Sequence, residues 1–110
     1  MKNNINQLPY SEVCKEKLHK FVDILINKID DVVLIVLFGS YARMEQTATS
    51  DLDILALTET EVDRSLRGEL CSIFDEYCSD LVFYTVDSFE RSDCLLVKQI
   101  REDGILLWKK

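Results

Sequence analysis

The sequence predicts an α/β protein, with one domain over residues 1–110 in which helices and strands alternate. Apolar residues make up 47% of the chain and charged residues 30%, a balance typical of globular proteins. Several segments carry apolar residues at helical spacing, and short, continuous apolar runs lie between them. A chain of 110 residues has room for one hydrophobic core.

The first helix is expected to begin after Ser11, because a serine hydroxyl is a good N-cap. Asp30 and Asp31 end this helix, and residues 32–38 then read VVLIVLF. An apolar run without polar alternation predicts a central strand that is covered on both faces. The apolar residues of the helix recur every three or four positions and predict one buried stripe: Cys14, Leu18, Phe21, Val22, Leu25 and Ile29.

Gly39 and Ser40 turn the chain into a short helix over YARMEQ, residues 41–46, for which Ser40 is the expected N-cap. The polar residues TATS end that helix. Residues 51–57 start polar and become wholly apolar. This pattern predicts a second central strand whose first residues are exposed in a cleft.

A second long helix is predicted by apolar residues at helical spacing, with Thr60 and Asp63 as its capping arrangement. Residues 80–86, DLVFYTV, are rich in strand formers and again begin with an aspartate. Ser88 is expected to cap a last helix, which Gly104 ends before a short terminal strand, ILLW. The expected order of elements is αβαβαβα followed by that strand.

Charge and composition exclude several classes of function. A net charge of −7 argues against a long nucleic acid as ligand, because such binding depends on clustered Lys and Arg. The longest apolar run has seven residues, whereas a membrane-spanning helix needs roughly 20. Four cysteines without a C-x-x-C pair, and a lone His19 read as a helix-surface residue, argue against a zinc site. Without a signal peptide, a cytoplasmic protein with reduced thiols is expected.

Two acidic residues mark the start of the second predicted strand. Because side chains alternate along a strand, Asp51 and Asp53 project to the same side while Leu52 points into the core. Two neighbouring carboxylates repel each other unless a proton or a cation intervenes. Oxygen ligands of this kind suit Mg²⁺ or Mn²⁺, which complete their coordination with water and with a substrate's phosphates.

The turn before this strand is a candidate phosphate site. A glycine at position 39 permits close approach of the backbone to a ligand, and the start of the following helix offers free N–H groups. Ser40 adds a hydroxyl, and Arg43 adds a cation near the same end. The P-loop pattern G-x-x-x-x-G-K-[ST] is absent, so this is a shorter phosphate cradle.

Asp80 joins this set if the third strand lies beside the second. Three carboxylates can then hold two metal ions, which stabilise the attacking and leaving oxygens at phosphorus. In this hypothesis Asp51 and Asp53 bridge both ions. Asp80 ligates only the ion at the attacking hydroxyl and also accepts that hydroxyl's proton.

Residues 39–53, GSYARMEQTATSDLD, resemble a pattern of the minimal nucleotidyltransferases in the DNA polymerase beta-like superfamily: G-S-x-A-R-G, five residues, then S-D-x-D. The later DLVFYT and REDGILLW resemble the family's third-carboxylate strand and closing segment. The resemblance implies a mixed sheet flanked by helices, an NTP donor, Mg²⁺, and nucleotidyl transfer with loss of pyrophosphate. It also implies nucleotide-binding roles for Gly39, Ser40, Arg43 and Ser50.

One position departs from the family pattern, because Met44 stands where a glycine usually follows the arginine. Since methionine is a good helix former, we expect Met44 to stiffen the short helix, with crowding of the nucleotide path as the lesser alternative. The resemblance also implies a partner, because minimal domains of this family lack a second domain to hold an acceptor. Similar proteins are the antitoxin halves of modules with a helical HEPN-domain ribonuclease, which the nucleotidyltransferase AMPylates.

Two functional hypotheses follow. The first is an active, Mg²⁺-dependent nucleotidyltransferase with ATP as donor and a hydroxyl of the HEPN-type partner as acceptor, or else a small-molecule hydroxyl such as that of an antibiotic. The second is a catalytically weak antitoxin that acts as a binding module, by contact. The sequence leaves the base preference, the acceptor and the formation of a homo-oligomer open.

Overall fold

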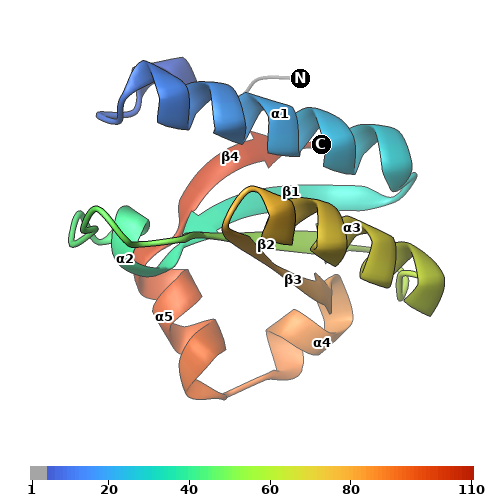
Figure 1. The fold of residues 1–110 in the computed structure, drawn as a ribbon. Coiled ribbons are helices and arrows are strands. Elements are labelled where there is room, and N and C mark those ends of the chain that lie inside the picture. The colour runs from blue at the N-terminus through green and yellow to red at the C-terminus, as the bar shows by residue number, and fades with distance from the viewer. Residues whose placement is uncertain (1–4) are drawn as a thin grey trace.

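The computed structural model describes residues 5–110, in which a four-stranded sheet is covered by helices on both faces (Figure 1). Helices α1 and α3 lie on one face, and α4 and α5 lie on the other. The elements are η1 (Ile5–Gln7), α1 (Glu12–Lys28), β1 (Val32–Phe38), α2 (Gly39–Ala42), β2 (Leu52–Thr58), α3 (Arg64–Glu76), β3 (Ser79–Thr85), α4 (Val86–Arg91), α5 (Leu95–Asp103) and β4 (Ile105–Lys109).

The sheet is mixed, with the strand order β3-β2-β1-β4. Strand β1 is antiparallel to both β2 and β4, whereas β2 and β3 are parallel and are joined by the crossover helix α3. The α/β prediction is confirmed, and the first strand has the predicted bounds. The second and third strands, predicted at 51–57 and 80–86, lie at 52–58 and 79–85.

Alternation along β2 divides the hydrophobic core between the two faces of the sheet. Leu52, Ile54 and Ala56 belong to the larger cluster, with side chains of α1 and α3, in which Phe21 and Phe74 stack with ring centroids 4.0 Å apart. Leu55 projects to the other face and belongs to a smaller cluster with Phe38 and with Ile100 of α5. Asp53 therefore projects to the α5 face.

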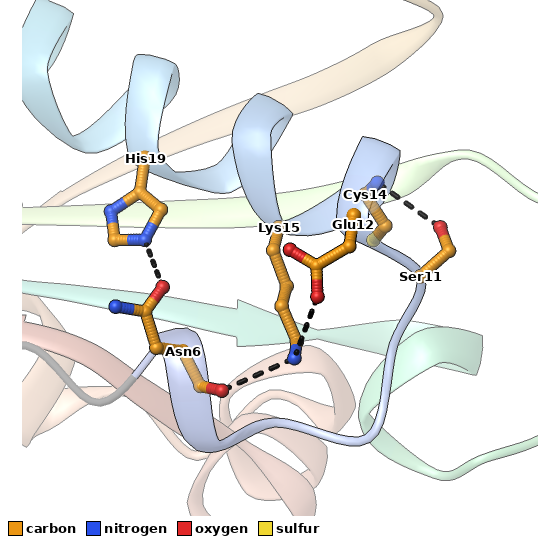
Figure 2. A network of polar contacts seen from close by, with 6 residues as sticks. All are labelled: Asn6, Ser11, Glu12, Cys14, Lys15 and His19. Carbon is orange, nitrogen blue, oxygen red and sulfur yellow. Dashed lines mark hydrogen bonds and ion pairs between the residues drawn. The ribbon is translucent and has the colours of Figure 1, made fainter.

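The N-terminus of α1 is capped as predicted, because the Ser11 hydroxyl accepts a hydrogen bond from the Cys14 N–H (Figure 2). The preceding segment is tied to this helix by Asn6. Its side-chain oxygen lies 2.8 Å from His19 Nε2, and its carbonyl accepts from Lys15 Nζ. His19 is thus a helix-surface residue that anchors the segment before the helix.

The cap of α3 is simpler than predicted. The Asp63 carboxylate alone accepts from the N–H groups of Ser65 and Leu66. Thr60 is not part of the cap, because its N–H and hydroxyl both donate to Asp31, at 2.8 and 2.6 Å. Thr60 therefore fastens the end of β2 to the segment before β1.

The prediction of one last helix capped by Ser88 was wrong. Two helices are present, and the hydroxyl of Thr85 caps the first by accepting from the Ser88 N–H. Ser92 and Cys94 adopt extended backbone conformations and separate the two helices. Phe89 and Leu96 are seven residues apart, a spacing that also fits one continuous helix, so the apolar pattern alone did not reveal the break. Gly104 ends α5 as predicted.

None of the helices described over residues 5–110 is long and apolar enough to cross a membrane.

Candidate active site

Two of the three predicted acidic residues lie directly opposite each other in the sheet. In the parallel register of β2 and β3, Asp53 pairs with Asp80. Paired residues of neighbouring strands project to the same face, so the two carboxyl groups lie close together, and the charge of Asp80 acts on Asp53. Asp51, exposed just before β2, is close enough for its charge to act on Asp53. The fold thus gathers all three acidic residues at the start of β2 and β3.

The environment of Asp53 disfavours its ionised form. Burial is the largest cause, followed by the negative charge of Asp80, the hydrogen bond with Asp80 and the charge of Asp51. Together they raise the pKa of Asp53 to about 6, although the nearby cation of Arg43 acts in the opposite direction. Carboxylates that repel each other in this way are relieved by a proton or by a bound cation.

The donor atoms at this position suit a magnesium ion. Mg²⁺ prefers oxygen ligands and uses one or two protein carboxylates, with water and substrate phosphates completing its shell. Asp53 and Asp80 fit that description. Over residues 5–110, however, no group of three or more His, Cys, Asp or Glu side chains already lies close enough together to hold a metal ion. The predicted metal-binding roles of Asp51, Asp53 and Asp80 therefore stay predictions.

Gly39 brings the backbone against this acidic pair. Its φ of +76° is a conformation that side chains disfavour. A β-carbon at this position would overlap Oδ2 of Asp53 and lie 3.0 Å from its Cγ. No residue with a side chain fits there without a shift of the backbone or of Asp53. Gly39 is therefore required for the turn to lie directly on the carboxylate.

The short helix after this turn differs from the prediction in both of its ends. It begins at Gly39 rather than Tyr41, and its N-cap is Phe38, which makes no side-chain cap bond. Ser40 lies inside the helix, so its predicted capping role was wrong. The left-handed backbone of Gly39 turns the chain directly after the strand. The nucleotide-binding role of Ser40 remains a prediction.

Met44 does not stiffen the helix, because the helix ends at Ala42. Met44 has a φ of 58°, its N–H donates to the carbonyl of Tyr41, and the Glu45 N–H donates to the carbonyl of Ser40. These two bonds around a left-handed residue form a Schellman motif, in which that residue is usually glycine. Met44 thus stands at a helix-ending position, where the glycine of the family pattern would be favoured.

Arg43 lies near the acidic pair but is already paired. Its Nε donates to Oε1 of Glu45 at 3.0 Å, and its positive charge acts on Asp53. Sequence reasoning missed Glu45, because residues two apart in a helix do not face each other. Only the left-handed turn at Met44 brings the two side chains together.

Contacts of Ser50 and of Tyr10 stabilise the loops around the site. The Ser50 hydroxyl accepts from the Thr47 N–H at 2.8 Å, and the Ser50 N–H donates to the carbonyl of Thr47, which closes the turn before Asp51. The predicted nucleotide contact of Ser50 stays untested.

Tyr10, which sequence reasoning missed, donates its hydroxyl to the carbonyl of Tyr41 at 2.7 Å and packs edge-on against the Tyr41 ring.

Comparison with known proteins places this arrangement in a family. The model for "Polymerase beta, Nucleotidyltransferase" matches residues 19–110. Two Methanocaldococcus jannaschii proteins named "Putative protein adenylyltransferase", MJ1217 and MJ0126, are each 38% identical to the chain. The first match covers 84% of this chain and 93% of MJ1217; the second covers 66% and 74%.

Solved structures share the fold. A chain from a toxin–antitoxin structure with AMP-PNP superposes with a TM-score of 0.66 at 29% identity, covering 84% of this chain and 73% of that one. A chain from the tri-AMPylated Shewanella oneidensis HEPN toxin in complex with its MNT antitoxin gives 0.63 at 26%, covering 87% and 72%. These findings confirm the resemblance read from residues 39–53. The chain belongs to the polymerase beta-like nucleotidyltransferase family, as one of its minimal members.

Proposed function

We propose that this protein transfers an AMP group from ATP to a hydroxyl of a helical HEPN-type partner protein, with Mg²⁺ as cofactor and pyrophosphate as leaving group. The observation that carries the proposal is the register that sets Asp53 beside Asp80, under the turn at Gly39 and near Arg43. The names of two relatives support protein adenylylation, and the solved complexes with AMP-PNP and with an AMPylated HEPN toxin support the donor and the partner.

Each residue has a distinct part in the proposed reaction. Asp51, Asp53 and Asp80 would hold the magnesium ions, which supply charge neutralisation for the phosphates when bound. The phosphate chain is bound and oriented by Arg43, Ser40, Ser50 and the backbone at Gly39. The acceptor oxygen attacks the α-phosphorus of ATP, and Asp80 takes the proton of the acceptor hydroxyl. The bond between the α-phosphorus and the oxygen that bridges to the β-phosphorus breaks, and pyrophosphate leaves.

The test uses ATP labelled at the α-phosphate, Mg²⁺ and a HEPN protein encoded beside this gene. We expect the label to appear on the HEPN protein with the wild type and to be lost with Asp53→Asn. Asp23→Asn removes the same charge from α1, on the opposite face of the sheet, and should leave labelling unchanged.

Absence of labelling by the wild type, or equal labelling by Asp53→Asn, would contradict the proposal. A complex that still silences its partner after Asp51→Asn and Asp53→Asn would instead favour a contact antitoxin. Labelling of an aminoglycoside-type hydroxyl but not of the HEPN protein would identify the small-molecule alternative.

A further inference from the structure

We propose that Glu45 is an internal counter-ion that competes with the nucleotide's phosphates for Arg43 and so weakens nucleotide binding. The inference rests on the proposed function, because it assigns a regulator to the same phosphate site. Its basis is the ion pair between Arg43 Nε and Glu45 Oε1, which are 3.0 Å apart.

The backbone builds this pair. In a continuing helix, residues 43 and 45 would project to different sides of the helix axis. Here the Schellman motif ends α2, and the left-handed Met44 reverses the chain between the two residues. The hydrogen bond from the Glu45 N–H to the carbonyl of Ser40, at 2.8 Å, holds the backbone of Glu45 against the helix. The turn at Met44 therefore places the Glu45 carboxylate beside Arg43.

The Glu45 carboxylate and a nucleotide phosphate would bind the same N–H donors of Arg43. A guanidinium binds carboxylates and phosphates alike, through a fork of parallel N–H donors. Glu45 occupies the Nε donor, so a phosphate that uses the Nε edge of the fork must displace it. The side chains of Arg43 and Glu45 are 36% and 66% exposed, so an incoming phosphate can reach the pair and exchange with the carboxylate.

The location of the pair links it to the active site. The charge of Arg43 acts on Asp53, which lies beside Asp80 and beneath Gly39. A nucleotide bound to the acidic pair through magnesium would place its phosphates near the same guanidinium. Glu45 adds a negative charge at that point, where the ligand is itself strongly negative.

The experiment is calorimetric titration of the full chain with AMP-PNP and Mg²⁺. We expect Glu45→Gln to bind about two- to fivefold more tightly than the wild type, the range expected when an exposed ion pair no longer competes. Glu59→Gln is the matched control: it removes the same charge just beyond the opposite end of β2 and should change nothing. In an Arg43→Lys background, which keeps the charge but loses the fork, the gain from Glu45→Gln should be much smaller.

The outcomes separate this inference from the proposed function. If the wild type binds AMP-PNP but Glu45→Gln binds it equally or more weakly, the inference is overturned and the proposed function stands. A gain of equal size in the Arg43→Lys background also overturns it, because simple charge repulsion would then be the cause. If no variant, the wild type included, binds AMP-PNP, the proposed nucleotide site and the inference fail together. Circular dichroism checks that each variant is folded.

Discussion

Met44 occupies a position that a glycine would fill with less strain. The left-handed region costs a residue with a β-carbon roughly 1–2 kcal/mol, and glycine avoids this cost. Glycine also makes the unfolded chain more flexible, which offsets part of the gain in folding stability. Met44 is 52% exposed, so little packing is lost when its side chain is removed.

We therefore expect Met44→Gly to increase the free energy of unfolding by about 0.5–1 kcal/mol, measured by urea denaturation. Met44→Ala keeps the left-handed strain and should give no such gain. A Met44→Gly variant that is less stable than Met44→Ala would contradict this account of the turn.

Gly39 is required for a different reason, namely its contact with Asp53. Gly39→Ala adds left-handed strain and an overlap with the Asp53 carboxylate, and we expect a loss of about 2 kcal/mol or more in unfolding free energy. Gly68→Ala is the matched control, because nothing lies within 4 Å of a β-carbon at that helical position. It should instead stabilise the protein by about 0.5–1 kcal/mol. Equal effects of the two substitutions would refute the close approach at Gly39.

Asp53 is expected to make stability depend on pH. Its pKa is raised from 3.8 to about 6, so the folded state binds a proton more readily than the unfolded state. This contribution is fully present below pH 4 and is lost as the pH rises through about 6. In EDTA, Asp53→Asn should therefore be more stable than the wild type at pH 8, by about 1 kcal/mol once solvent screening of this partly buried group is considered.

The advantage of Asp53→Asn should shrink towards pH 4, where the wild-type carboxyl is protonated. Thermal denaturation at the two pH values measures it. A difference in Tm that does not change with pH would show that the repulsion around Asp53 is negligible.

Helix α3 depends on one cap at its N-terminus, and this helix makes the crossover that sets β3 parallel to β2. The carboxylate of Asp63 accepts from two N–H groups of the first turn. Asp63→Ala should lower the free energy of unfolding by about 1 kcal/mol, whereas Asp63→Ser keeps a capping oxygen and should lose clearly less. Chemical denaturation measures the loss of stability in each variant. Equal losses in the two variants would mean that the capping oxygen contributes nothing to stability.

Helical and strand elements were predictable wherever one strong local pattern decided them. The run at 32–38 became a strand with those bounds, and Ser11 capped the first long helix. Prediction failed where two signals of similar strength competed. Ser88 and Thr85 both precede the last apolar stretch, and only the backbone bend at 92–94 shows that Thr85 caps a separate, shorter helix.

The folded domain as a whole should be stabilised by its nucleotide. A ligand that binds only the folded state at about 100 times its Kd adds about 2.7 kcal/mol, which is an increase in Tm on the order of 10 °C for a domain of this size. AMP-PNP with Mg²⁺ should produce that shift in the wild type and in Asp23→Asn. Asp53→Asn should lose most of it, and so should the wild type in EDTA. An identical shift in all samples would place the nucleotide elsewhere on the molecule.

Local patterns in the chain predicted the alternation of helices and strands except for the break between α4 and α5, and the motif at residues 39–53 indicated the family. They also gave the candidate residues at positions 39, 43, 51, 53 and 80, whose roles stay predictions. They sufficed because periodicity, turn chemistry and motif spacing are properties of neighbouring residues. Only the tertiary structure decided that Asp80 lies opposite Asp53, that Gly39 contacts that carboxylate, and that Glu45 meets Arg43. Strand register depends on the packing of segments distant in sequence, and the left-handed backbone angles at Gly39 and Met44 do not follow from helical or strand periodicity.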